Sequence, residues 1–107
     1  PTPLVRGDYV FASTGYGAGA ALVKVVAQGT DVKAEEVYFL DNNKFQNHHG
    51  GMVLIGDHIF AGTGHNQGFP ICVEFLTGKI AWRQPRGPGQ GSAAITYADG
   101  NLIFRYQ

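Results

Sequence analysis

Residues 7–15 read GDYVFASTG, and residues 56–64 read GDHIFAGTG. Six of the nine positions are identical, so the chain carries an internal repeat. A third copy begins at residues 100–104, GNLIF, and residues 103–104 align with residues 59–60. Repeats spaced by about 45–50 residues are typical of β-propeller blades. The repeat therefore predicts an array of similar structural units.

Each copy contains short apolar segments that are separated by turn residues. The first segment of each copy ends at a Gly-Asp or Asp-Gly dipeptide, which tolerates the positive φ that a tight hairpin turn needs. Helical spacing is weak, and only residues 32–37 have a pattern that fits a helical turn. We expect first strands at 3–6, 52–55 and 93–97, second strands at 9–13, 58–62 and 101–106, third strands at 21–26 and 70–75, and fourth strands at 35–40 and 80–84.

Four antiparallel strands followed by a connection to the next copy describe a propeller blade. The predicted fold is an all-β propeller segment of about two and a half four-stranded blades. The blades are expected at residues 2–40 and 50–85, with a half blade at 91–107.

Composition limits the classes of partner. The 107 residues carry a formal net charge of zero, which argues against a nucleic-acid partner because phosphate binding needs a basic surface. No apolar run approaches the roughly 20 residues of a membrane-spanning helix. The single cysteine, Cys72, lies in an apolar run and is expected to be a buried thiol.

The ends of the chain indicate a fragment of a longer protein. The sequence starts at Pro1 without a methionine and stops at Gln107 within an alternating apolar run. The expected partners therefore include the remaining propeller blades of the same chain. Alone, the fragment would leave an open apolar blade face, so we expect poor solubility or self-association.

Residues 72–82, CVEFLTGKIAW, resemble the tryptophan-docking motif of quinoprotein-type propellers, Ala-x-Asp-x-x-Thr-Gly-Lys-x-x-Trp. Glu74 stands in the place of the motif's Asp, while Thr77, Gly78 and Trp82 match it. The resemblance implies that Thr77-Gly78 forms the turn between the third and fourth strands. It also implies that Trp82 packs between neighbouring blades. Residues 26–33 of the first copy lack the motif. The expected inter-blade core also contains Tyr9, Phe11, Phe60, Phe75 and Phe104.

The whole chain is similar to quinoprotein-like (PQQ-like) repeat proteins, which occur in many bacteria. Residues 47–51, NHHGG, and 97–100, YADG, add to the likeness. It implies a propeller, often of eight blades, in an exported or periplasmic protein. It does not by itself imply a bound quinone, since the same fold carries unrelated functions.

The blade topology sends one set of loops to a single face, at residues 14–19, 41–51, 63–68 and 83–91. Histidine, amide and tyrosine side chains on glycine-rich loops suit a hydroxylated or anionic ligand. Arg86, in the loop at 83–91, can pair with a carboxylate or phosphate. The candidate ligand-binding residues are Tyr16, His48, His49, His65, Asn66, Gln67 and Arg86.

Other interpretations of these residues stay open. His48 and His49 are adjacent, so on an extended chain they point to opposite sides and do not share one ion. A third ligand for a site with His65 is not evident, and no metal is predicted. The histidines can instead bond backbone groups that join one blade to the next, and residues 65–67 can be a simple polar loop.

Two hypotheses of function remain. The favoured one is a non-enzymatic binding scaffold whose loop face engages a protein or glycan. The alternative is part of a PQQ-dependent alcohol or sugar dehydrogenase, with pyrroloquinoline quinone and calcium bordered by His48, His65 and Arg86. The sequence holds no adjacent cysteine pair and no recognisable calcium-and-base set, which favours the scaffold; no catalytic residue is assigned.

Overall fold

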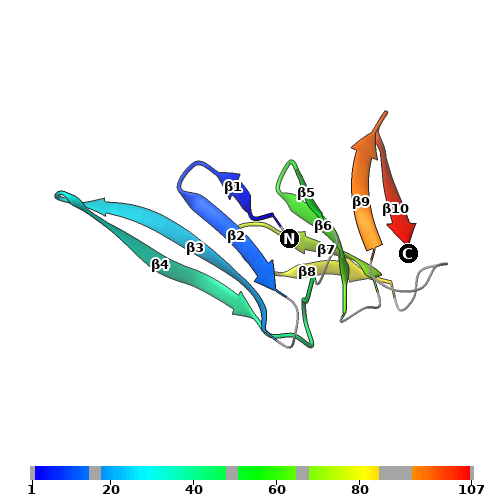
Figure 1. The fold of residues 1–107 in the computed structure, drawn as a ribbon, viewed down its shortest axis with the longest axis horizontal. Coiled ribbons are helices and arrows are strands. Elements are labelled where there is room, and N and C mark those ends of the chain that lie inside the picture. The colour runs from blue at the N-terminus through cyan, green and yellow to red at the C-terminus, as the bar shows by residue number, and fades with distance from the viewer. Residues whose placement is uncertain (1, 15–17, 48–50, 65–67, 85–92, 107) are drawn as a thin grey trace.

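The computed structural model describes residues 2–14, 18–47, 51–64, 68–84 and 93–106. These residues form ten β-strands in three antiparallel sheets and contain no helix (Figure 1). The prediction of an all-β chain is confirmed. No helix of the described residues is long and apolar enough to cross a membrane.

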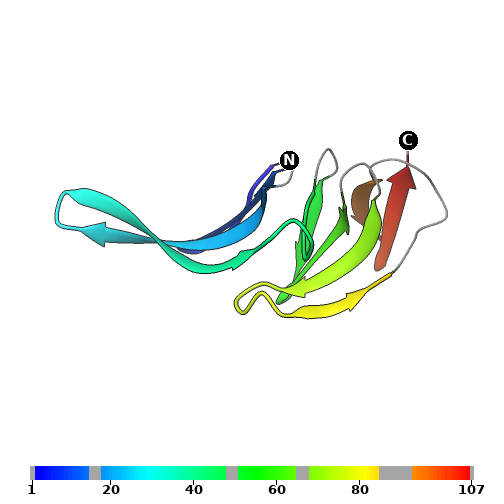
Figure 2. The same cartoon turned by 90° about the horizontal axis from the view of Figure 1, so that it is seen from below.

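The strands follow one another in chain order within each sheet. The first sheet consists of β1 (Leu4–Arg6), β2 (Tyr9–Thr14), β3 (Gly19–Gln28) and β4 (Asp31–Leu40). The second sheet consists of β5 (Met52–Ile55), β6 (His58–Thr63), β7 (Phe69–Glu74) and β8 (Ile80–Arg83). The C-terminal hairpin consists of β9 (Ala93–Ala98) and β10 (Asn101–Tyr106). The three units lie next to one another in chain order (Figure 2).

The two four-stranded sheets share their internal geometry. The amide of Val25 donates to the carbonyl oxygen of Asp8 at 2.7 Å, and the amide of Phe75 donates to that of Asp57 at 2.8 Å. Each sheet also has a register shift where its third strand pairs with its fourth, after the pair Leu22–Tyr38 in the first sheet and after the pair Cys72–Trp82 in the second. Equivalent bonds and equivalent bulges show that the two sheets are structural copies.

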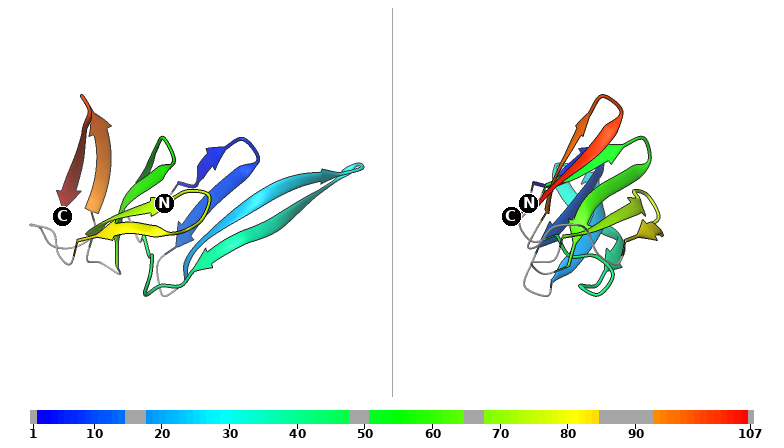
Figure 3. Two further views of the ribbon diagram at one scale, coloured as in Figure 1. Left: turned by 180° about the vertical axis from the view of Figure 1, so that it is seen from behind. Right: turned by 90° about the vertical axis from the view of Figure 1, so that its right-hand side faces the viewer.

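The copies differ most beyond the bulge. Strands β3 and β4 have ten residues each, whereas β7 has six and β8 has four. We call residues 25–34 the arm. In the first sheet these residues extend β3 and β4 as a hairpin, whereas the second sheet turns at the equivalent point. The arm points away from the rest of the molecule (Figures 1 and 3). The strands expected at 21–26 and 35–40 are present as β3 and β4, but both are longer than expected. The helical turn at 32–37 was also wrong, because this segment pairs with β3 along its length and forms part of β4.

The third copy has a different alignment from the one expected. Asn101 pairs with Ala98 across the turn, as His58 pairs with Ile55 in the second sheet. Leu102 is therefore the equivalent of Ile59, and the sequence alignment of residues 103–104 with 59–60 was wrong by one position. Because a one-residue shift exchanges the two faces of a strand, Ile103 points away from the second sheet and is 53% exposed.

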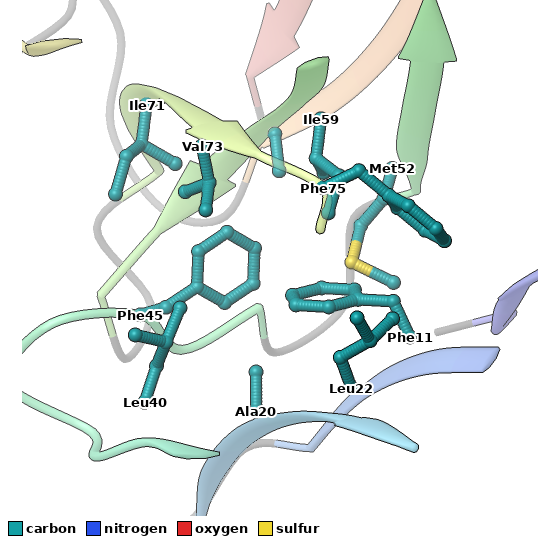
Figure 4. Close-up of a cluster of buried hydrophobic side chains, with 11 residues drawn as sticks. Phe11, Ala20, Leu22, Leu40, Phe45, Met52, Ile59, Ile71, Val73 and Phe75 are labelled. Atoms are coloured by element: carbon teal, nitrogen blue, oxygen red, sulfur yellow. The ribbon is translucent and has the colours of Figure 1, made fainter. Parts of the chain in front are cut away.

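The main core lies between the two four-stranded sheets (Figure 4). Phe45, from the connection between the sheets, inserts edge-on against Phe11 with ring centroids 5.3 Å apart. Both rings are fully buried, and so is Phe75. Among the other expected core aromatics, Tyr9, Phe60 and Phe104 are half-buried and Trp82 is 41% exposed. The core residues are Phe11, Ala20, Leu22, Leu40, Phe45, Met52, Ile59, Ala61, Ile71, Val73 and Phe75.

Candidate functional site

One end of the sheets, which we call the loop end, gathers the described strand ends that flank the candidate loops. Thr14 and Gly19 pair across the end of β2 and the start of β3, and Thr63 pairs with Phe69 in the second sheet. Leu40 closes β4 at the same end, because it pairs with Ala20 at the start of β3. The seven candidate ligand-binding residues, Tyr16, His48, His49, His65, Asn66, Gln67 and Arg86, lie outside the described residues. Their role stays a prediction.

The connection between the two sheets starts with a turn that Asp41 holds. Its carboxylate oxygen Oδ1 accepts hydrogen bonds from the amides of Asn43 at 3.0 Å and Lys44 at 3.1 Å. Its carbonyl oxygen accepts another from the amide of Phe45 at 2.9 Å. This turn redirects the chain so that Phe45 enters the core. The guanidinium of Arg83 donates to the carbonyl oxygen of Asn43 at 3.0 Å and ties the turn to β8.

Next, the connection binds the ends of β2 and β6 through polar groups. The amide of Asn47 donates to Ser13 Oγ at 3.0 Å, and Asn47 Nδ2 donates to the carbonyl oxygen of Gly62 at 2.9 Å. The amide of Gln46 donates to Thr63 Oγ1 at 2.8 Å. We call Ser13, Gln46, Asn47, Gly62 and Thr63 the polar base. It fixes the loop ends of both sheets to one segment.

Asn47 has one unused acceptor. The residue is 1% exposed, and no donor reaches its Oδ1 atom in the described part of the chain. A buried polar atom without a partner costs about 1–3 kcal/mol. The polar base therefore includes a preformed position for one hydrogen-bond donor. Asn47 was predicted on the open loop face, whereas the structure buries it.

Gly62 lets the C-terminal hairpin approach the second sheet. A Cβ atom at this position would lie 3.0 Å from the Cβ of Ala93 and 3.2 Å from the Cα of Gly68. The equivalent residue of the first sheet is Ser13, whose hydroxyl donates to the carbonyl oxygen of Gly19 at 3.2 Å. The exchange of serine for glycine between the copies thus has a steric reason, which the sequence alone did not give.

The Thr-Gly turn of the second sheet contacts the first sheet. Thr77 Oγ1 donates to Glu74 Oε1 at 3.2 Å, and the Gly78 amide donates to the carbonyl oxygen of Glu74 at 2.9 Å. Gly78 has a φ of 75°, and a Cβ there would lie 2.7 Å from the ring of Tyr38. The turn therefore needs glycine both for its backbone and for the ring of Tyr38 on β4.

Trp82 occupies the same place in the second sheet as Tyr38 in the first. Trp82 pairs with Cys72 and Tyr38 pairs with Leu22, just before the equivalent bulges. The indole lies tilted against Phe60 with centroids 6.2 Å apart. Its packing between neighbouring blades stays a prediction. Tyr38 was not singled out from the sequence, although it lies on the fourth strand of the first sheet as Trp82 lies on the fourth strand of the second.

Two side chains have altered acidity. Burial raises the pKa of the Tyr38 phenol. Burial, followed by the nearby Glu74 carboxylate, raises the pKa of the Cys72 thiol. Because the thiolate is the nucleophilic form, Cys72 is a packing residue and not an activated one. Among the described residues, no group of three His, Cys, Asp or Glu side chains could hold a metal ion.

Comparisons with protein-family models, with curated proteins and with solved structures each found no match.

Proposed function

We propose that this chain is a segment of a quinoprotein-like β-propeller that acts as a non-enzymatic binding scaffold. Its loop end would present Tyr16, His48, His49, His65, Asn66, Gln67 and Arg86 to a protein or glycan. Two consecutive four-stranded antiparallel sheets with equivalent bonds and bulges support the propeller. The remaining blades of the same chain would cover the open faces of these sheets.

The observation that carries the binding function is the polar base. Asn47 joins Ser13 of β2 to Gly62 of β6, so the ends of two sheets are held at fixed positions by one segment. Loops that start from a rigid base need less ordering when they bind, which favours recognition. The base itself contains amide and hydroxyl groups and no ionised side chain, which suits a supporting role more than acid–base chemistry.

A binding screen tests the proposal. The chain is applied to glycan and peptide arrays, and each positive ligand is then titrated by calorimetry. Arg86→Ala should weaken binding, because the guanidinium is the strongest anion-pairing group of the loop end. Lys79→Ala is the control, since this cation lies in the turn at the opposite end of the second sheet. Equal loss in both variants, or binding that Arg86→Ala leaves unchanged, would contradict the proposal.

A further inference from the structure

The fourth strand of the first sheet has a long edge that no described strand covers. Strand β4 lies at the end of the order β1-β2-β3-β4, so in the described part of the chain it pairs only with β3. Residues 31–37 are all exposed, and the arm carries part of this edge away from the other sheets (Figure 3). We call residues 32–36 the β4 edge.

The main-chain groups of alternate residues point outward along the β4 edge. In an antiparallel ladder, the amide and carbonyl of one residue point to the same side, and this side alternates along the strand. The amide of Val25 donates to the carbonyl oxygen of Asp8, on the side of β3 away from β4. Val25 pairs with Ala34, so the main-chain groups of Ala34 point away from β3. Those of Val32 and Glu36 do the same.

An exposed edge of this kind is a template for a further strand. Propeller blades pack face to face and leave only short edges. The remaining blades that we propose would therefore cover the faces of the first sheet and leave the β4 edge open. Strand β4 has ten residues, whereas its equivalent β8 has four. The extra length is thus an edge that packing between blades does not use.

We propose that the β4 edge pairs antiparallel with the β4 edge of a second copy of this chain. The two-fold axis passes between Ala34 and Ala34 of the second copy, and the two first sheets join into one. Lys33 then lies opposite Glu35 of the second copy, and Glu35 lies opposite Lys33 of the second copy. Because the symmetry repeats each pair, the edge complements its own charges.

The charges also select this register over the other symmetric ones. An axis at Lys33, Glu35 or Glu36 would set that residue against the same residue of the second copy, which is unfavourable for like charges. An axis at Val32 would run the ladder into the turn at 29–30 after a few residues. The axis at Ala34 alone gives opposite charges and a ladder along the whole β4 edge.

The neighbouring strand adds to the charge complementarity. Lys24 of β3 pairs with Glu35 on the same side of the sheet. In the proposed dimer, Glu35 therefore lies between Lys24 of its own chain and Lys33 of the second copy. Charges of alternating sign then cross the joined sheet, an arrangement that a strand of unrelated sequence would not provide.

The contact is short, so the dimer should be weak and dissociate on dilution. Each outward-facing pair exchanges two main-chain hydrogen bonds, which gives about six along the β4 edge. Strand addition derives its affinity from such bonds more than from a large buried area. The reciprocal ion pairs then supply the choice of partner and register.

Disulfide trapping tests the register and captures a weak dimer. In Ala34→Cys the paired Cα atoms of the two copies would lie about 5.5 Å apart, within the range of a disulfide. Val32→Cys is the matched control, because Val32 is 71% exposed on the same strand but would lie about 14 Å from Val32 of the second copy. The native Cys72 is 2% exposed and common to both variants. Under air oxidation, Ala34→Cys should form covalent dimer at least tenfold faster than Val32→Cys.

Charge exchange tests the occupant in the Ala34→Cys background. Lys33→Glu sets glutamate against Glu35 of the second copy, and Glu35→Lys sets lysine against Lys33. Each variant alone should cross-link about tenfold more slowly at low salt. An equimolar mixture of the two restores both ion pairs and should cross-link near the parent rate. Circular dichroism checks that each variant is folded.

These rates separate edge pairing from association through the open apolar faces, which would not distinguish the two cysteine positions. Equal cross-linking of Ala34→Cys and Val32→Cys would overturn the proposal. So would an Ala34→Cys rate no higher than that of the native chain, or a mixture that is no faster than its two components.

Discussion

The hydroxyl of Tyr38 donates a 2.7 Å hydrogen bond to the carbonyl oxygen of Phe75, and this bond joins β4 of the first sheet to the end of β7 in the second. The ring of the same tyrosine lies against Gly78. On the other side, the Arg6 guanidinium lies 5.8 Å from the centroid of the Phe75 ring and also bonds the carbonyl oxygen of Gly56. The contact between the sheets is therefore polar at its rim and apolar at its centre.

Removing the hydroxyl should weaken this contact measurably. Tyr38→Phe leaves the carbonyl oxygen of Phe75 without its partner, so the free energy of unfolding should fall by about 1 kcal/mol. Chemical denaturation measures the change. Tyr97→Phe serves as the control, because Tyr97 is 50% exposed. An unchanged stability in Tyr38→Phe would show that the bond adds nothing to the sheet contact.

Alkaline pH should destabilise the chain through the same residue. Burial raises the pKa of Tyr38 above its ordinary value of 10.0, so the folded state keeps the phenol proton longer than the unfolded state does. Stability from this group is complete below pH 10 and is lost as the pH rises above it. Tyr38→Phe should show a flatter decline in unfolding free energy between about pH 9 and 11 than the native chain. Parallel declines would contradict this assignment.

Gly78 should be far more sensitive to substitution than a glycine in an open turn. Gly78→Ala adds a positive-φ penalty of about 1 kcal/mol and a clash with the Tyr38 ring. Gly56→Ala carries only the backbone penalty, because its φ is +58° and no atom lies within 4 Å of the added Cβ. The excess cost in Gly78→Ala should disappear when Tyr38→Ala is added, as a double-mutant cycle would show. Equal costs for the two glycines would refute the contact.

Asn47 should not tolerate a negative charge. Asn47→Asp loses the Nδ2 donor to Gly62 and places a carboxylate where the native side chain is 1% exposed. Burial raises the pKa of such a carboxyl, so the variant should lose stability as the pH rises through and above about 4. Asn47→Ala should cost about 1–3 kcal/mol without that pH dependence. Thermal melts at several pH values compare the two, and identical pH profiles would contradict a dry polar base.

Most of the strand pattern was accessible from sequence, because the turns carry local signals. Gly7-Asp8, Gly56-Asp57 and Asp99-Gly100 all form turns with positive φ at one or more residues. The arm was missed because strand length depends on the pairing of β3 with β4, although Gln28 and Asp31 pair across a Gly29-Thr30 turn whose glycine has a φ of 62°. The alignment of the third copy was wrong because the identical pairs Ile103-Phe104 and Ile59-Phe60 were matched. The turns that precede them, which set the register of the strands, were not matched.

The candidate site was predictable only in part. Asn47 was placed at the correct end, yet its burial arises from contacts with Ser13 and Gly62, residues 34 and 15 positions away. Such long-range bonds have no local signature. The predicted ligand-binding residues, with His48, His65 and Arg86 among them, stay predictions.

We propose that the chain is part of a binding scaffold and not of a quinone enzyme. Titration of pyrroloquinoline quinone with calcium, followed by absorbance and by reduction of an artificial dye in the presence of alcohols and sugars, tests it most directly. We predict no saturable change in quinone absorbance and no substrate-dependent dye reduction. Stoichiometric quinone binding with dye reduction, abolished by Arg86→Ala and retained in Lys79→Ala, would contradict the scaffold and establish the dehydrogenase.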